Sequence, residues 1–297
     1  MNHSRFPHLS EKTAMQLFLS DAERIAYIQQ PRWVGYPRAQ QILDKLEELL
    51  VFPKMDRMPN CLIYGETNNG KTMLVNKFFN KHRPDDNPNG ESSIVPVLYV
   101  QAPPVPDEGR LYNSILERLF APYKPSDRAD RKEFQVIKLM RAVGVKILII
   151  DELHHLIAGN STKQRAFLNV IKHLGNELRI PLVGVGTREA IHAIGTDAQL
   201  ENRFDREELP LWQNNKEYLQ LLATFERSLP LQKASNLVEI DLADQIFAMG
   251  QGYLGETSRL LLNAASYAVK SGQEQINKKV LNSIRWVSPS ERRREVR

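Results

Sequence analysis

The spacing of apolar residues predicts alternating strands and helices in the middle of the chain. Strands are expected where short apolar runs occur, at 61–64, 94–101, 146–150, 182–186 and 207–211. The last of these is predicted to be an edge strand, because Pro210 has no amide proton to donate to a neighbour. Helical spacing separates the runs, at 71–82, 109–119, 129–143 and 162–178. This alternation predicts an α/β fold around a central parallel five-stranded sheet.

Both flanks of this region are predicted to be helical. Helices are expected before the first strand at 21–29 and 38–50, and after the last strand at 214–229, 239–249, 257–271 and 274–285. The chain is therefore divided into an N-terminal helical extension (1–37), an α/β domain (38–212), a small helical domain (213–287) and a basic C-terminal tail (288–297).

Composition adds limits to this picture. Hydrophobic residues make up 42% and charged residues 25% of the chain, which is ordinary for a globular protein. The net charge of +5 permits a polyanionic partner without proving one. Cys61 is the single cysteine, so no disulfide forms within the chain, in keeping with a reducing cytoplasm. Neither a signal peptide nor an apolar stretch long enough to cross a membrane is evident, so we expect a cytoplasmic protein without a membrane partner.

A phosphate-binding motif lies between the first strand and the following helix. The sequence Gly65-Glu66-Thr67-Asn68-Asn69-Gly70-Lys71-Thr72 matches the P-loop, or Walker A, pattern at every fixed position. Glycines allow a tight turn whose amides converge on phosphate oxygens, and the helix N-terminus adds positive potential. Lys71 would neutralise the β- and γ-phosphates of ATP, and the Thr72 hydroxyl would bind Mg²⁺.

Two carboxylates follow the most apolar strand. Asp151 and Glu152 come directly after 146–150, where ligands of parallel sheets bind, and this arrangement is typical of a Walker B motif. Asp151 would hold Mg²⁺ through water, and Glu152 would act as the general base that activates the attacking water. We expect the adjacent His154 and His155 to diverge and to have a packing or supporting role rather than to bind a metal.

Together these motifs resemble the AAA+ family, and most closely its TniB and TnsC transposition regulators, with MuB more distant. The similarity extends from about residue 5 to 285. It rests on the segments 31–39, 57–60, 65–72, 149–155 and 186–190.

The resemblance assigns roles to three further residues, Thr187, Arg203 and Arg259. Thr187 would sense the γ-phosphate and the water, although capping of the next helix explains it equally well. Arg203 would act as an arginine finger on a neighbouring subunit's ATP, with Arg206 as the fallback and a surface ion pair to Glu201 or Asp205 as the alternative. Arg259 would reach the phosphates from the helical domain, which would serve as a lid, and Thr257 would cap its helix.

The resemblance also implies partners. Such ATPases bind ATP and Mg²⁺, assemble on double-stranded DNA as rings or helical filaments of about six or seven subunits per turn, and stimulate a DDE transposase in bacteria. A TniQ-type target selector is a further partner. The segment 288–297 could supply a partner surface. Basic residues that could face DNA phosphates precede the third strand: Lys124, Arg128, Arg131, Lys132, Lys138 and Arg141. An ordinary solvated helix face explains them as well, since acidic residues are interspersed.

Two other functions compete with an ATP-dependent regulator of transposition. One is a metabolic P-loop kinase, or another P-loop NTPase that does not act on DNA. No inserted substrate lid is apparent, and the helical domain with Arg259 favours AAA+. The other is a scaffold that binds ATP without hydrolysing it, against which the presence of Glu152 argues.

Overall fold

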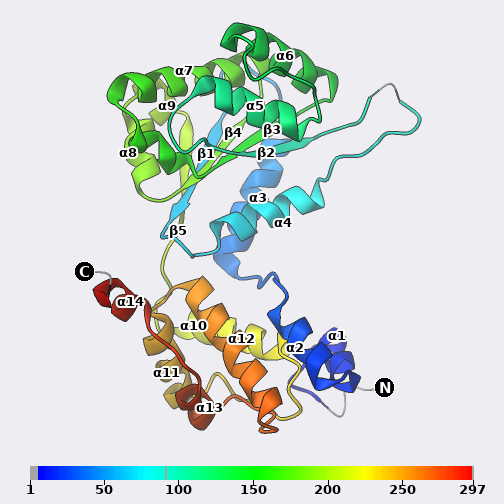
Figure 1. Cartoon of the computed structure of the whole chain (residues 1–297), viewed down its shortest axis with the longest axis vertical. Coiled ribbons are helices and arrows are strands. Elements are labelled where there is room, and N and C mark those ends of the chain that lie inside the picture. Colours follow the sequence, from blue (N-terminus) through cyan, green and yellow to red (C-terminus); the bar gives the residue numbers. More distant parts are fainter. Residues whose placement is uncertain (1–5, 91, 296–297) are drawn as a thin grey trace. The chain divides into compact units, whose positions relative to one another are not determined.

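The computed structural model describes residues 6–90 and 92–295, which form two compact units. One unit comprises residues 37–210 and is called here the nucleotide unit; the other combines residues 1–36 with 211–297 and is called the helical unit. Figure 1 labels their elements. The N-terminal extension therefore belongs to the same unit as the C-terminal helices, although more than 170 residues separate them in sequence.

The nucleotide unit is built on a parallel sheet of five strands in the order β2-β3-β4-β1-β5. The strands are β1 (Asn60–Gly65), β2 (Val97–Gln101), β3 (Ile147–Asp151), β4 (Leu182–Gly186) and β5 (Phe204–Leu209). The predicted fold class and the edge position of β5 are confirmed. The predicted bounds of β5 are wrong: it begins three residues earlier, and Pro210 lies just beyond its end. Its sequence is charged at four central positions, so apolar spacing does not reveal it.

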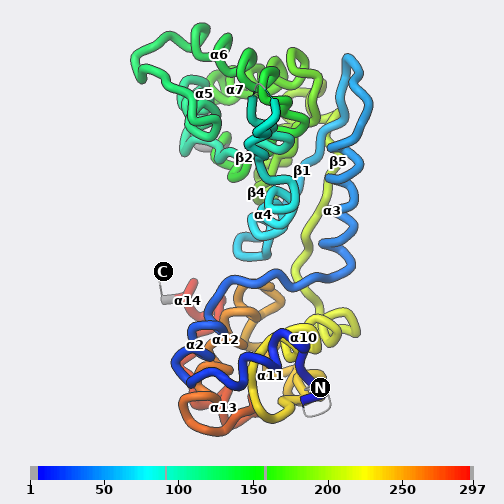
Figure 2. The backbone as a smooth tube through the Cα atoms, turned by 90° about the vertical axis from the view of Figure 1, so that its right-hand side faces the viewer, coloured from blue at the N-terminus to red at the C-terminus, as the bar shows by residue number. Residues whose placement is uncertain are grey.

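Helices cover both faces of this sheet. They are α3 (Pro37–Leu50), α4 (Lys71–Lys81), α5 (Glu108–Arg118), α6 (Ala129–Ala142), α7 (Ser161–Leu178), α8 (Glu189–Gly195) and α9 (Ala198–Glu201), with the 3₁₀ helix η2 (Leu153–Ala158) after β3. Alternate strand residues such as Leu148 and Ile150 pack in one core with α5 to α9. Helix α3 runs beside β5 (Figure 2), where Arg38 pairs with Glu207 at 2.9 Å and Lys45 with Asp205 at 2.9 Å.

The helical unit contains the remaining elements. They are α1 (Glu11–Met15), η1 (Gln16–Phe18), α2 (Asp21–Gln29), α10 (Lys216–Ser228), α11 (Ile240–Gly250), α12 (Leu254–Lys270), α13 (Lys278–Ser283) and α14 (Pro289–Glu295). Helix α2 has the predicted bounds because Ser20 and Glu23 form a capping box at its start. Its Ile28 packs in one hydrophobic core with residues of α10, α11 and α12.

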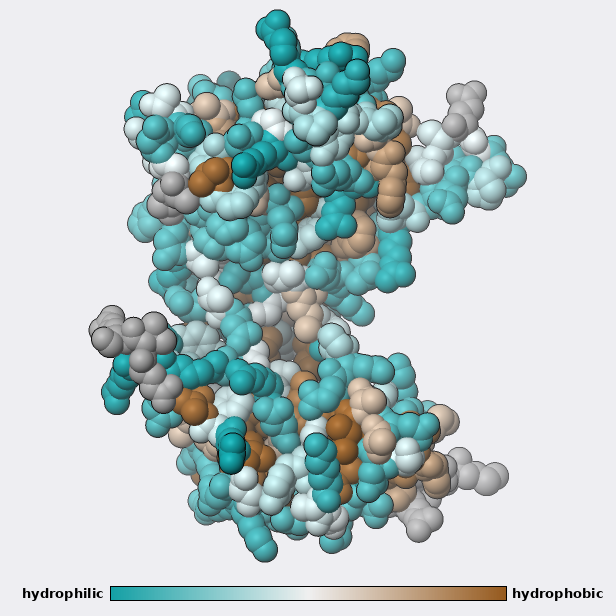
Figure 3. All heavy atoms as spheres, in the orientation of Figure 1, coloured by the Kyte–Doolittle hydropathy of each residue, from teal (hydrophilic) through white to brown (hydrophobic). Residues whose placement is uncertain are grey.

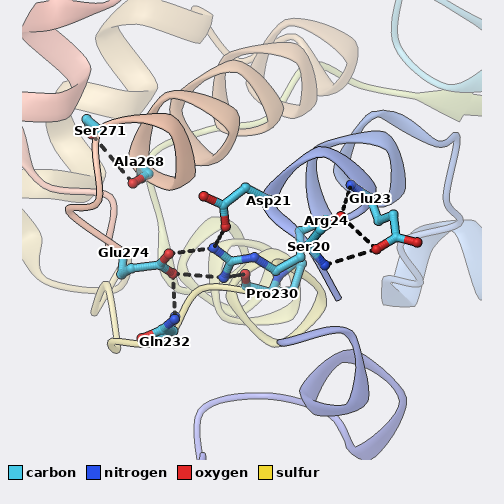
Figure 4. Close-up of polar contacts among 9 residues, drawn as sticks. All are labelled: Ser20, Asp21, Glu23, Arg24, Pro230, Gln232, Ala268, Ser271 and Glu274. Atoms are coloured by element: carbon cyan, nitrogen blue, oxygen red, sulfur yellow. Dashed lines mark hydrogen bonds and ion pairs between the residues drawn. The ribbon is translucent and has the colours of Figure 1, made fainter. Parts of the chain in front are cut away.

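A buried ion pair joins the two sequence segments of the helical unit (Figure 4). Arg24 of α2 is 1% exposed, and its guanidinium donates two hydrogen bonds to the Glu274 carboxylate, at 3.0 and 2.5 Å. Glu274 also accepts from the Gln232 amide at 3.1 Å. Because both charges are paired and hydrogen-bonded, burial is tolerated, and the pair holds α2 against the loop after α12.

The C-terminal tail predicted at 288–297 contains helix α14, and its last two residues lie outside the described part. Arg292 of α14 donates to the buried Glu256 carboxylate, and Arg293 donates to the Tyr253 hydroxyl at 2.8 Å. Hydrophilic side chains cover most of the face shown in Figure 3. Among the described residues, none of the helices is both long and apolar enough to traverse a lipid bilayer.

Candidate nucleotide-binding site

The loop between β1 and α4 has the backbone geometry that its glycines predict. Gly70 precedes α4 in a left-handed conformation with φ of 88°, which glycine adopts without strain. At Gly65, a Cβ atom would lie 2.4 Å from the Leu209 carbonyl oxygen, so only glycine fits beside β5. Both glycines are therefore required by the path of the loop itself.

The Asn69 side chain links this loop to the end of β5 by hydrogen bonds. This side chain is buried, and its amide nitrogen donates to the carbonyl oxygens of Leu209 and Pro210, both at 2.9 Å. The side chain of Asn69 is thus engaged in shaping the loop, and its expected contribution to phosphate binding falls to the backbone.

Lys71 lies at the first position of α4, with its ammonium folded back over the loop. The ammonium donates to the carbonyl oxygens of Gly65 at 2.9 Å and Glu66 at 2.8 Å. Burial lowers the pKa of Lys71 from its usual value, while the charges of Glu152 and Asp151 oppose that shift. A desolvated cation enclosed by a loop of backbone groups suits a phosphate anion.

The Asp151 carboxylate accepts hydrogen bonds from three segments of the unit. Its Oδ2 accepts from the Thr72 hydroxyl at 3.0 Å and from the Tyr99 hydroxyl at 2.7 Å, and its Oδ1 accepts from the Glu152 amide at 2.8 Å. Thr72 and Asp151 are brought together as predicted. Tyr99 was missed, because its position within an apolar strand predicts only a core residue. The hydroxyl and carboxylate oxygens are ligand types that Mg²⁺ prefers, so the pair fits that ion.

Glu152 occupies a left-handed conformation with φ of 57°, immediately after β3. Its carboxylate lies 3.2 Å from Nε2 of His154. The rings of His154 and His155 do not diverge as predicted: their centroids are 4.8 Å apart, because both residues lie in the tight 3₁₀ helix η2. One ligand-type atom from each of Glu152, His154 and His155 lies within 4.8 Å of the others.

The remaining candidates of the nucleotide unit differ in their contacts. The Thr187 hydroxyl donates to the Glu189 carboxylate, and α8 has no side-chain cap, so the capping interpretation of Thr187 is not supported. Arg203 donates to the Asn176 side-chain oxygen at 2.8 Å and, within the described residues, forms no ion pair. Arg206 is paired with Glu201 at 2.8 Å. Of these two arginines, Arg203 is the one without an ion pair among the described residues.

Arg259 lies on α12 of the helical unit. It is exposed, and its guanidinium lies 5.4 Å from the centroid of the Trp286 ring, a cation–π geometry. The predicted capping by Thr257 is wrong, because α12 begins at Leu254 and Thr257 is buried inside it, 3.3 Å from the Tyr218 hydroxyl.

The basic candidates around α6 are not equivalent. Lys132 is 4% exposed and its ammonium donates to the Pro125 carbonyl at 2.9 Å, so it does not fit a DNA-facing role. Arg128 and Arg131 are exposed but lie near Asp130 and Asp127 at 3.2 and 3.3 Å. Lys124 and Lys138 are exposed, and Arg141 pairs with Glu177 at 3.2 Å.

Comparisons with known proteins agree with this geometry. The family model described as "Bacterial TniB protein" matches residues 24–214, which is more than half of the chain. A search of curated proteins finds no match. Among solved structures, the Aeropyrum pernix ORC2 protein in ADPNP–ADP complexes has a TM-score of 0.61 at 16% identity, covering 86% of this chain and 70% of that one.

Two more structures share the fold. Cdc6p from Pyrobaculum aerophilum has a TM-score of 0.57 at 16% identity, with 87% of this chain and 68% of that one covered. Drosophila ORC bound to DNA has a TM-score of 0.58 at 12% identity, with 89% and 65% covered. At these identities the likeness shows the AAA+ fold, which accords with the sheet order and the position of the P-loop.

Proposed function

Since this chain belongs to the bacterial TniB family and has a P-loop AAA+ fold, we propose that it is an ATP-dependent, DNA-binding regulator of transposition. It binds and hydrolyses ATP, assembles on double-stranded DNA, and recruits and stimulates a DDE transposase. The observation that carries this proposal is the convergence of Lys71, Thr72, Asp151 and Glu152 at one edge of the sheet. The ADPNP–ADP complexes of the similar Aeropyrum structure support a nucleotide at such a fold.

Each residue has a part in this function. The loop amides and Lys71 bind the phosphates. Thr72 and Asp151 would hold Mg²⁺, which would neutralise phosphate charge. Glu152 orients the attacking water and accepts its proton. Thr187 contacts the γ-phosphate. Arg203 contributes from a neighbouring subunit, and Arg259 from the helical unit.

Duplex DNA is bound through its phosphates, without reading of bases. Exposed side chains are kept by five of the candidates on the α5–α6 loop and α6: Lys124, Arg128, Arg131, Lys138 and Arg141. The structure of Drosophila ORC bound to DNA supports a DNA partner for this fold. Affinity should fall steeply with salt and should vary little between sequences. A binding selection that returns a strong consensus would contradict this.

Glu152→Gln tests the proposal most directly. This variant keeps the shape of the side chain but removes the base, so ATP should bind while hydrolysis falls at least about a hundredfold. Assemblies on duplex DNA should then persist in ATP, as measured by ATPase assay and by negative-stain imaging. Glu48→Gln, which changes an exposed carboxylate of α3, is the matched control and should behave as the wild type. A Glu152→Gln variant that stays monomeric with ATP and duplex would refute the assembly model.

A further inference from the structure

Tyr99 lies where β2 passes beside the carboxylate of Asp151. In the parallel register of β2 and β3, Tyr99 is opposite Ile149, and Gln101 is opposite Asp151. Leu98 and Val100 point into the core beneath α5 to α7, so Tyr99 lies on the other face, toward α4. It is 9% exposed, and its hydroxyl donates to Asp151 Oδ2 at 2.7 Å.

The ring of Tyr99 is held from two sides. The Phe79 ring of α4 lies 6.3 Å away between centroids, and the Arg118 guanidinium at the end of α5 lies 5.9 Å from the Tyr99 ring centroid. A ring packed in this way fixes the direction of its hydroxyl, since only rotation of the O–H bond remains. An ordinary tyrosine hydroxyl is protonated at neutral pH, so it is available as a donor to Asp151.

We propose that Tyr99 is the positioning residue for Asp151, and that it sets the direction in which this carboxylate faces the metal–nucleotide complex. The proposal rests on the function assigned above. The Thr72 hydroxyl also donates to Oδ2, but Thr72 is exposed and belongs to the nucleotide loop. The Glu152 amide donates to Oδ1 from the adjacent residue. Tyr99 is therefore the one buried side-chain donor, among the contacts described for Asp151, that comes from outside the two nucleotide motifs.

A role restricted to packing would have different consequences. Phenylalanine at this position would fill the same volume and keep the contacts with Phe79 and Arg118. Loss of the hydroxyl alone would leave Asp151 Oδ2 with only the Thr72 contact among those described. Partners that orient a metal ligand commonly change metal affinity or activity by about ten- to a hundredfold. The effect should therefore depend on the presence of Mg²⁺.

The test is the Tyr99→Phe variant of the full chain, with affinity for a non-hydrolysable ATP analogue measured in Mg²⁺ and in EDTA. We expect affinity in Mg²⁺ to fall about tenfold, and affinity in EDTA to match the wild type. Tyr112→Phe is the matched control, because Tyr112 is also a buried tyrosine and its hydroxyl donates to a carboxylate, that of Glu133, at 2.9 Å. It should leave both affinities unchanged.

A second variant tests whether Tyr99 acts through Asp151. In an Asp151→Asn background, Tyr99→Phe should cause no additional loss of affinity in Mg²⁺, because the two residues act as one unit. A further tenfold loss there would overturn the proposal. Equal losses in Mg²⁺ and EDTA, or no loss in either, would also overturn it. If the wild-type chain binds no nucleotide in Mg²⁺, the proposed function itself fails, which is a distinct result.

Discussion

The two units of this protein use polar side chains in opposite ways. In the nucleotide unit, Lys71 and Asp151 lie at the edge of a sheet whose apolar core is complete without them. In the helical unit, Arg24 and Glu274 are buried against each other across 250 positions of sequence, and Arg24 also pairs with the exposed Asp21 at 3.0 Å. Substitution of a polar group in the nucleotide unit should therefore impair function without unfolding the unit. Substitution of the buried pair in the helical unit should destabilise the fold.

Of the substitutions that test this comparison, Arg24→Met is expected to have the largest effect. It leaves Glu274 buried without its ion pair, and removal of one partner of a buried pair costs about 3–5 kcal/mol. The free energy of unfolding of the helical unit should fall by that amount. All three tryptophans, Trp33, Trp212 and Trp286, belong to this unit, so urea unfolding followed by tryptophan fluorescence reports on it specifically.

Two further variants make this measurement decisive. Glu23→Ala, on the exposed side of the same helix, removes one part of the capping box and should cost only about 1 kcal/mol. The double variant Arg24→Met with Glu274→Leu should recover most of the loss, because no charge remains buried. If Arg24→Met costs no more than Glu23→Ala, the ion pair does not hold the two segments together.

The next effect is expected from Lys71→Ala in the nucleotide unit. Loss of the ammonium should weaken ATP binding about a hundredfold, equivalent to about 2.7 kcal/mol, because phosphate charge is left unmatched. The free energy of unfolding should change by less than about 1 kcal/mol. Calorimetric titration and urea unfolding followed by circular dichroism measure the two quantities. Lys77→Ala, an exposed position on the same helix, carries the same loss of charge and should change neither. Unchanged affinity in Lys71→Ala would refute the nucleotide site.

How much of the structure the sequence predicts depends on whether a feature is local or joins distant segments. The P-loop and the acids after β3 are local patterns, and the strand-to-helix context places them at one edge of a parallel sheet, so Thr72 and Asp151 meet as expected. Helix α2 has its predicted bounds, and the capping box at its start is also local, since Ser20 and Glu23 are three positions apart.

Contacts between distant segments were not predictable. Nothing in the local sequence of Arg24 indicates that Glu274 is its partner, and Tyr99 resembles any other aromatic residue of a buried strand. Lys132 looks like an exposed cation by composition, yet the fold turns its ammonium onto the Pro125 carbonyl. In each case the deciding factor is tertiary contact, which periodicity and composition do not contain.

The smallest effect is expected at Asn69, which is both buried within the fold and part of the proposed nucleotide site. Its side chain is buried like Arg24, yet it shapes the loop that is proposed to bind phosphate. Asn69→Ala removes two hydrogen bonds to β5 and should lower the free energy of unfolding by about 1–2 kcal/mol, while ATP affinity falls only severalfold because the loop amides remain. Urea unfolding and titration with an ATP analogue measure both.

Asn69→Asp sharpens that test. It keeps the shape of the side chain but replaces the donor with oxygen, which faces the Leu209 and Pro210 carbonyl oxygens. Both stability and affinity should fall further than in Asn69→Ala, since acceptors would oppose acceptors and a negative charge would lie beside the phosphate loop. If the two variants lose ATP affinity but not stability, the role of Asn69 is in nucleotide binding, like that of Lys71. If they lose stability but not ATP affinity, Asn69 stabilises the fold, as Arg24 does. The loop then binds phosphate independently of its attachment to β5.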